Sequence, residues 1–256
     1  MNHTTRKSTD IGRCIDKLAQ KLTSNALKKS KRPSWATHSL HDKLNTLEDK
    51  VAASPYAAML ASPLRLCMYH RRMFPSRMLL RFGMVQDKYK NKLYPLPEVG
   101  RTKPSGPNGI KRYVRLRRPI FDELSQKGSK LIFLGKAEFQ KDTMEIIHHE
   151  IALYAQNHYK NNNNYLKELS RLENDLWQSS SNEITYQCIL ISSTDEKTPF
   201  YQHHRIINPQ GKLSTLPCYN IARIGENLDK EGYGVVKSAS TVELAIALYR
   251  YGAFFS

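Results

Sequence analysis

Short apolar runs along the second half of the chain have the length and composition of β-strands. They are rich in Ile, Leu, Val and Tyr, and polar turn residues such as Asn208-Pro209-Gln210-Gly211 separate them. Runs of this kind, about four to eight residues long, are typical of strands. The predicted strands cover residues 130–134, 186–192, 200–207 and 233–237.

Apolar residues spaced three or four apart predict the helices of the same half. A long helix is expected over residues 136–158 and a shorter one over 166–177, with a solvated loop at the asparagine run 160–164. Ser240 and Glu243 have the spacing of a capping box and predict the start of a C-terminal helix. Because strands and helices alternate, we expect a small α/β-layer domain with a mixed sheet.

The first half of the chain is harder to divide into elements. Ser62 followed by Pro63 suits the start of a helix, but the segment suits a strand equally well, and the pattern leaves both readings open. The other expected elements are a polar helix over about 40–51, a strand over 77–85, a loop over 94–109 with four Pro and three Gly, and a half-exposed strand over 110–116.

The N-terminal segment reads as a basic arm. Residues 1–32 contain nine Lys and Arg against two acids, and Ile11, Ile15, Leu18 and Leu22 fall on one helical face. This composition fits a mitochondrial presequence, a basic surface helix or an RNA-binding arm. The chain as a whole is expected to be α+β or α/β. We divide it into a basic amphipathic arm (1–52), a basic, aromatic-rich segment that faces nucleic acid (53–120) and a near-neutral α/β domain (121–256).

Charge is distributed very unevenly along the 256 residues. Residues 1–120 hold 26 Lys and Arg against 7 acids, whereas residues 121–256 hold 14 against 16, so the whole net charge of +17 comes from the first half. Such a block repels itself in isolation and is most simply explained by a polyanionic partner. Nucleic acid is therefore the first candidate.

The densest basic stretch, between residues 65 and 118, is weighted toward arginine and interleaved with aromatic rings. Guanidinium groups bind phosphate bidentately, and aromatic faces stack on unpaired bases, so this mixture favours RNA. An alternative is that the rings belong to the core and the arginines to a solvated face. The predicted phosphate contacts are Arg65, Arg71, Arg72, Arg77, Arg81, Lys111, Arg112, Arg115, Arg117 and Arg118.

No motif in the sequence indicates catalysis, a metal site or a cofactor. His148-His149-Glu150 lacks the HExxH spacing of zinc proteases, and His203 and His204 would point to opposite faces of a strand. The four cysteines are far apart and predict free thiols. No stretch is long and apolar enough to predict a membrane span. A metal-dependent nuclease would need converging carboxylates, for which the sequence offers only Glu145, Glu150, Asp195 and Glu196.

Two groups of short motifs carry a family resemblance. Tyr56, the run Leu60-Ala61-Ser62-Pro63 with Arg65, and the later Arg77-Met78-Leu79-Leu80 form the first; Cys188-Ile189-Leu190-Ile191, Lys197-Thr198-Pro199 and the turn toward Leu216 and Asn220 form the second. In this order they resemble the fungal mitochondrial family named for "required for respiratory growth protein eight".

The resemblance implies a protein of the mitochondrial matrix that is needed to maintain and express the mitochondrial genome, through processing of the 5′ ends of mitochondrial tRNA. It supplies no catalytic residues, and it favours the presequence reading of residues 1–32. We therefore expect a non-enzymatic, RNA-associated factor whose C-terminal domain docks mitochondrial protein partners. A structural protein of the mitochondrial ribosome and a metal-dependent nuclease are the alternatives.

Overall fold

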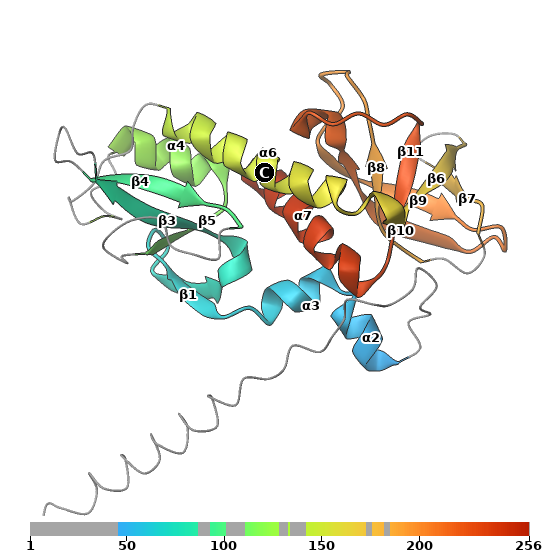
Figure 1. Cartoon of the computed structure of the whole chain (residues 1–256), viewed down its shortest axis with the longest axis horizontal. Coiled ribbons are helices and arrows are strands. Elements are labelled where there is room, and N and C mark those ends of the chain that lie inside the picture. Colours follow the sequence, from blue (N-terminus) through green and yellow to red (C-terminus); the bar gives the residue numbers. More distant parts are fainter. Residues whose placement is uncertain are drawn as a thin grey trace, which may run out of the picture. The chain divides into compact units, whose positions relative to one another are not determined.

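The computed structural model describes residues 46–86, 93–100, 111–127, 133, 142–172, 176–181 and 185–255, which belong to one compact unit. The arm over residues 1–45, the segment 101–110 and most of the strand expected over 130–134 lie outside the described residues. The described part is α+β, with helices and two mixed sheets (Figure 1).

The first sheet has the strand order β2-β1-β5-β3-β4, with β1 and β5 parallel and the other pairs antiparallel. The strand and half-exposed strand expected over 77–85 and 110–116 are confirmed as β3 and β5. The segment after Ser62-Pro63 is a strand, β1. The strands are β1 (Leu64–Cys67), β2 (Arg72–Pro75), β3 (Leu79–Gln86), β4 (Leu93–Glu98) and β5 (Arg112–Arg115).

The loop expected over 94–109 is wrong in its first part, because β4 occupies residues 93–98. Pro95 and Pro97 stand opposite Met84 and Phe82 in β3. Proline lacks the backbone N–H that a central strand must donate, but it is tolerated in an edge strand. Strand β4 is the last strand of its sheet as the structure describes it. It therefore has no second neighbouring strand to which Pro95 and Pro97 would have to donate backbone hydrogen bonds.

The second sheet closes into a six-stranded barrel in the order β10-β8-β11-β6-β7-β9. The strands expected over 186–192, 200–207 and 233–237 are confirmed as β8, β9 and β11, with the turn at 208–211 between β9 and β10. The barrel strands are β6 (Leu166–Arg171), β7 (Leu176–Ser179), β8 (Tyr186–Ile191), β9 (Tyr201–Ile207), β10 (Leu213–Asn220) and β11 (Gly232–Val236).

The helix expected over 166–177 is wrong, and so is the simple α/β layer that it implied. The segment forms β6 and β7, which link β11 to β9 and close the barrel. Its Leu, Lys and Glu residues are good helix formers, but Leu169 and Trp177 are buried inside the barrel. Tertiary burial therefore overrides a local preference worth less than about 1 kcal/mol per residue.

Helices pack between and beside the two sheets. The long helix expected over 136–158 is confirmed as α6 in its described part, and the C-terminal helix as α7. Ten residues of α7 are buried, and nine of them are uncharged, as expected for a helix in the centre of a fold. The helices are α2 (Leu47–Ala52), α3 (Pro55–Leu60), α4 (Arg118–Lys127), α6 (Thr143–Lys160) and α7 (Val242–Phe255).

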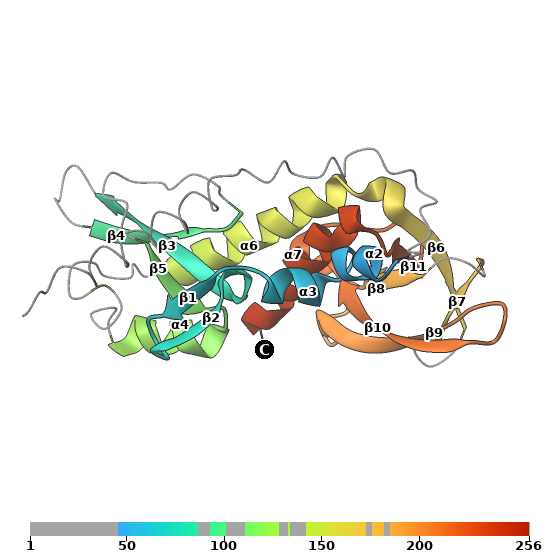
Figure 2. The ribbon, with the colours of Figure 1, turned by 90° about the horizontal axis from the view of Figure 1, so that it is seen from below.

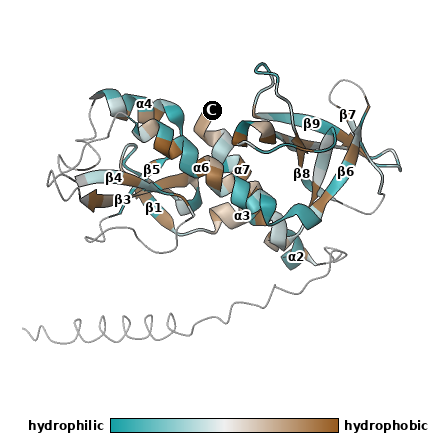
Figure 3. Cartoon of the chain, turned by 45° about the horizontal axis from the view of Figure 1, so that its top comes forward, coloured by the Kyte–Doolittle hydropathy of each residue, from teal (hydrophilic) through white to brown (hydrophobic). Residues whose placement is uncertain are grey.

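Residues from both halves of the sequence share one hydrophobic core. Leu80 and Phe82 of β3 belong to the same buried cluster as Ile147 of α6, Leu190 of β8 and Leu248 of α7. Strand β8 is buried at every position, and its last four residues, Cys188–Ile191, are apolar (brown in Figure 3). The change of charge near residue 120 therefore does not separate two cores. Among the described residues, no helix is long and apolar enough to cross a membrane.

The start of helix α3 corrects the expectation at Ser62. The cap is Ser54, whose hydroxyl accepts from the backbone N–H of Ala57, with Pro55 in the first turn. Ser62 instead ends the helix, because its hydroxyl donates to the Met59 carbonyl at 2.6 Å and accepts from the Arg77 N–H. Helix α3 packs against α7 (Figures 1 and 2).

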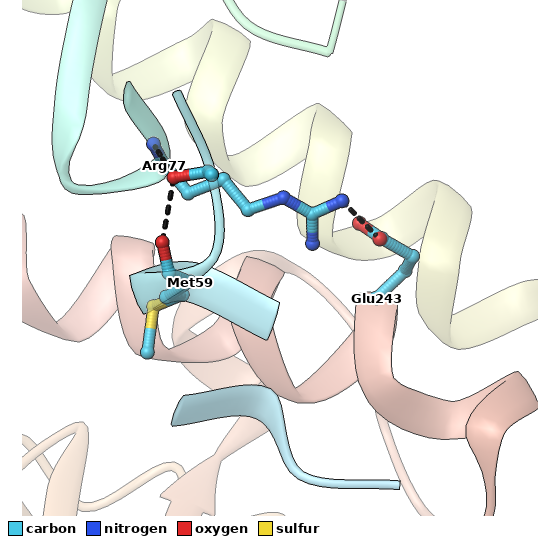
Figure 4. Close-up of polar contacts among 4 residues, drawn as sticks. Met59, Arg77 and Glu243 are labelled. Carbon is cyan, nitrogen blue, oxygen red and sulfur yellow. Dashed lines mark hydrogen bonds and ion pairs between the residues drawn. The ribbon is translucent and has the colours of Figure 1, made fainter. Parts of the chain in front are cut away.

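The capping box expected at Ser240 is displaced by two residues. Ser238 and Thr241 form it, at the start of a short 3-10 turn that leads into α7. Glu243 is not part of this capping box and forms an ion pair with Arg77 at 2.6 Å (Figure 4).

Candidate nucleic-acid interface

The two faces of the first sheet differ sharply in chemistry. Leu80 and Val114 are paired across β3 and β5 and face the hydrophobic core. Directly opposed residues point to the same side of a sheet, and neighbours along a strand point to opposite sides. The pairs Arg81 with Tyr113, Cys67 with Tyr113, and Arg65 with Phe74 therefore lie on the other face.

Two cation–π contacts organise this second face. The guanidinium of Arg65 lies 5.8 Å from the ring centroid of Tyr113, and that of Arg115 lies 5.4 Å from that of Phe74. Both rings are half-buried. A guanidinium stacked on a ring is oriented while its N–H edge stays available for phosphate. We call Arg65, Arg72, Phe74, Tyr113 and Arg115 the basic-aromatic face.

The β1–β2 hairpin extends the positive charge of this face. Burial lowers the pKa of His70, and the charges of Arg115, Arg72 and Arg117 lower it further. The imidazole therefore lies in a region of positive potential from these three arginines. The His70 ring also contacts that of Phe74 at a centroid distance of 5.8 Å. The sequence argument missed His70, although its position between Tyr69 and Arg71 in the basic stretch was a usable signal.

Backbone strain is present in the same hairpin. Arg71 has φ of 56°, and its N–H donates to the Cys67 carbonyl at 2.8 Å. Residues with a Cβ rarely adopt this left-handed conformation, which costs roughly 1–2 kcal/mol. Arg71 is exposed, so the hairpin holds an exposed arginine at a position where glycine would be easier to accommodate.

Three of the predicted phosphate contacts form ion pairs within the protein. Arg81 pairs at 2.5 Å with Glu98, whose side chain is fully buried. Arg77 pairs with Glu243, and Arg118 pairs more loosely with Asp122 at 3.9 Å. The buried pair joins β3 to β4, so Arg81 has a structural role whatever else it contacts.

The other predicted contacts divide between the two faces. Arg112 stands opposite Phe82, on the side of the core, and is half-buried, as is Lys111. Arg117 follows β5 and is exposed, like Arg65, Arg71 and Arg72. The structure thus gathers Arg65, Arg71, Arg72, Arg115 and Arg117 on and beside the basic-aromatic face.

The aromatic residues of the basic stretch also divide. Phe82 and Phe121 pack on each other in the core, with ring centroids 6.0 Å apart. Tyr69 packs against the core, and its hydroxyl donates to Glu123 in α4. For Phe82, strand register alone separates this core ring from Phe74 and Tyr113, and the sequence does not supply that register.

One histidine of each pair makes a hydrogen bond to an aromatic residue of the fold. His148 Nε2 is 2.8 Å from the Tyr251 hydroxyl. His204 is buried in the barrel, where its Nδ1 accepts from Trp177 at 2.9 Å, and His203 is exposed on the opposite face, as expected for a strand. Within the described ranges, no three His, Cys, Asp or Glu residues come close enough to hold a metal ion.

Three of the four cysteines lie in the described part of the chain, and all three are buried thiols that form no disulfide with one another. Burial and the nearby Cys218 raise the pKa of the Cys188 thiol.

Comparisons with known proteins give no further guide to this interface. No protein-family model, no curated protein and no solved structure matches the chain. The resemblance carried by the short motifs around Ser62 and Cys188 therefore stays a prediction from sequence.

Proposed function

We propose that this protein binds single-stranded RNA through the basic-aromatic face of its first sheet. The observation that carries the proposal is the pair of stacks between Arg65 and Tyr113 and between Arg115 and Phe74 on one face. Each stack places a cation, which can bind a phosphate, beside an aromatic ring, which can stack on a base. That combination suits an unpaired strand better than a duplex, whose bases are not exposed.

The charge of the sheet supports a polyanionic partner. Glu98 is the one acid in the five strands of this sheet as the structure describes them, and it is paired with Arg81. The guanidiniums of Arg65, Arg72 and Arg115 therefore have no carboxylate within their own strands. Arginine clusters of this kind normally carry interspersed acids when they are merely solvated.

We further propose that the protein works in the mitochondrial matrix, as a non-enzymatic factor in expression of the mitochondrial genome. This part rests on the sequence resemblance alone. Import of a tagged full-length chain into isolated mitochondria, followed by protease protection, tests it directly. A chain that stays outside and protease-sensitive contradicts it.

RNA binding is tested by fluorescence anisotropy with a labelled RNA of twelve nucleotides over a range of salt concentrations. If about six phosphates are neutralised, the slope of log affinity against log salt is about −4 to −5, because each contact to a single strand contributes about −0.7. A flat salt response contradicts the proposal.

The double variant Arg65→Gln/Arg115→Gln removes both stacked cations. We expect it to weaken binding by about 10- to 100-fold, since two accessible contacts are lost and each contributes roughly 0.7–1.4 kcal/mol. The matched control is Arg205→Gln, an exposed arginine on β9 of the barrel. Equal losses in both variants would show that binding follows net charge and not this face.

A further inference from the structure

Beside the basic-aromatic face lies a cavity of about 130 Å³ that the proposed function does not explain. It is bounded by the segment that leads into β3, the end of β5, and helix α7. None of the residues that line it is acidic. The lining residues that matter for its chemistry are Arg77, Arg115, Arg117, Arg250, Tyr201 and Tyr249.

Arg250 is the unusual member of this set. It is only 8% exposed, and its Nη2 donates to the Leu79 carbonyl at 3.2 Å. Its guanidinium lies 5.9 Å from the Tyr154 ring centroid, and its buried Nε has no hydrogen-bond partner. A buried charge without a full set of partners costs several kcal/mol. The buried guanidinium of Arg250 therefore destabilises the fold unless a ligand supplies the hydrogen-bond acceptor that Nε lacks.

A second unpartnered donor lines the same cavity. Arg77 uses Nη2 for the ion pair with Glu243, while its Nη1 is buried and has no hydrogen-bond partner (Figure 4). Two guanidinium donors from distant parts of the chain thus remain unsatisfied beside Arg115 and Arg117. Four cations around one small space attract an anion with several acceptor oxygens.

The tyrosines restrict the class of anion. The Tyr201 ring is exposed on β9, and Tyr249 is half-buried on α7. Rings next to a phosphate-binding cluster are the usual stacking platform for a nucleobase. A bare carboxylate or inorganic anion would use the arginines alone, whereas a nucleotide would use the arginines and the rings.

We propose that this cavity binds the phosphate monoester of a nucleotide, either at the end of an RNA strand or as a free mononucleotide. The RNA-end form rests on the proposed function, and Arg115 connects the two sites because it belongs to both. A strand that follows the basic-aromatic face would then terminate in the cavity. The mononucleotide form does not depend on RNA binding.

The test compares RNA strands of one sequence with a 5′-phosphate, a 3′-phosphate or hydroxyl groups at both ends. A hydroxyl strand one nucleotide longer controls for the added charge. We expect one phosphorylated end to bind about tenfold more tightly than the longer hydroxyl strand, the factor for roughly one charge-assisted contact. AMP alone is titrated in parallel to detect the mononucleotide form.

Arg117→Gln is the first variant, because Arg117 is exposed and its loss should not disturb folding. Arg250→Lys, which keeps the charge and removes Nε, is the second. Both should reduce the preference for a phosphorylated end, whereas Arg65→Gln should weaken phosphorylated and hydroxyl strands in equal proportion.

The outcomes separate the two proposals. Salt-dependent RNA binding without any preference for a phosphorylated end, and without AMP binding, overturns the cavity site and leaves RNA binding standing. AMP binding that Arg117→Gln weakens, in a protein that binds no RNA, supports the cavity and overturns the proposed function.

Discussion

The five-stranded sheet and the six-stranded barrel bury their side chains in different ways. The barrel encloses Leu169, Trp177, Ile189 and Ile206 in an interior of its own. One face of the sheet packs on the shared core, and the other carries arginines and rings around the buried Cys67 and Leu79. A closed sheet has no unpaired edge and hides its polar backbone, whereas an open sheet leaves a surface for a ligand. We therefore assign stability mainly to the barrel and binding mainly to the sheet.

The helices between them explain how both roles exist in one compact unit. In helix α7, Leu248 belongs to the shared core, Glu243 forms an ion pair with Arg77, and Arg250 donates a hydrogen bond to the Leu79 carbonyl. Each of these contacts joins the end of the chain to the first sheet. Residues of the near-neutral half (121–256) thus hold parts of the basic half (1–120) in place. Counting charges along the sequence does not reveal these contacts.

The largest expected effect is on stability and comes from the barrel. Trp177→Ala removes a ring that is 1% exposed together with its hydrogen bond to His204. We expect the free energy of unfolding to fall by about 3–5 kcal/mol, as for other buried aromatic residues. Urea denaturation measures this loss. RNA affinity of the folded fraction should be unchanged, and a parallel loss of affinity would break the division of roles.

A smaller loss of stability is expected from the ion pair inside the sheet. Glu98→Gln leaves Arg81 next to a neutral side chain in a buried setting, and breaking such pairs costs about 3 kcal/mol. The contrasting variant is Glu243→Gln, because the pair with Arg77 is more than a third exposed on both sides. That pair should contribute less than about 1 kcal/mol. Equal losses would contradict the assignment of Arg81 to structure.

Sequence patterns predicted the elements whose local and tertiary preferences agree. Residues 186–191 are strand formers and are buried at every position, so β8 follows from composition alone. Residues 166–171 are helix formers, and only pairing with β11 and β7 makes them a strand. Barrel closure is a long-range property, and no window of the sequence contains it.

The residues of the candidate site were likewise only partly predictable from the sequence. The charge block drew attention to Arg65 and Arg115, but it could not distinguish Phe74 from Phe82, because strand register decides which ring faces the core. Arg250 was missed because it lies in the near-neutral half, 171 residues from Leu79. The single arginine in the apolar sequence of α7 could have indicated this residue, since arginine is rarely buried unless it has a partner.

The pH dependence of binding should be weaker than these effects but opposite in sign to that of stability. The pKa of His70 lies below its ordinary value of 6.5 in the folded protein. The unfolded chain therefore takes up more protons as pH falls through 6.5, and stability decreases toward acid. His148 and His158 also have lowered pKa values and act in the same direction.

RNA phosphates near His70 would raise its pKa again, so binding takes up a proton. We expect affinity to increase as pH is lowered through the same range in which stability declines. Anisotropy titrations at several pH values measure this, with thermal unfolding recorded on the same samples. His70→Gln should abolish the increase, whereas an unchanged pH profile in that variant would place the RNA elsewhere.

The smallest expected effect on stability comes from Arg71, where binding and stability oppose each other most directly. Arg71→Gly relieves the left-handed backbone at φ of 56°, a gain of roughly 1–2 kcal/mol. The greater freedom of glycine in the unfolded chain offsets about 0.5–1 kcal/mol of it. The unfolding free energy should therefore rise by about 0–1.5 kcal/mol, while RNA affinity falls. Arg71→Ala, which loses the guanidinium but keeps the strain, is the matched control. If glycine were less stable than alanine by the full entropic difference of about 0.5–1 kcal/mol, the strain would be absent. If both variants bound RNA as tightly as the natural chain, this exposed arginine would lie outside the interface.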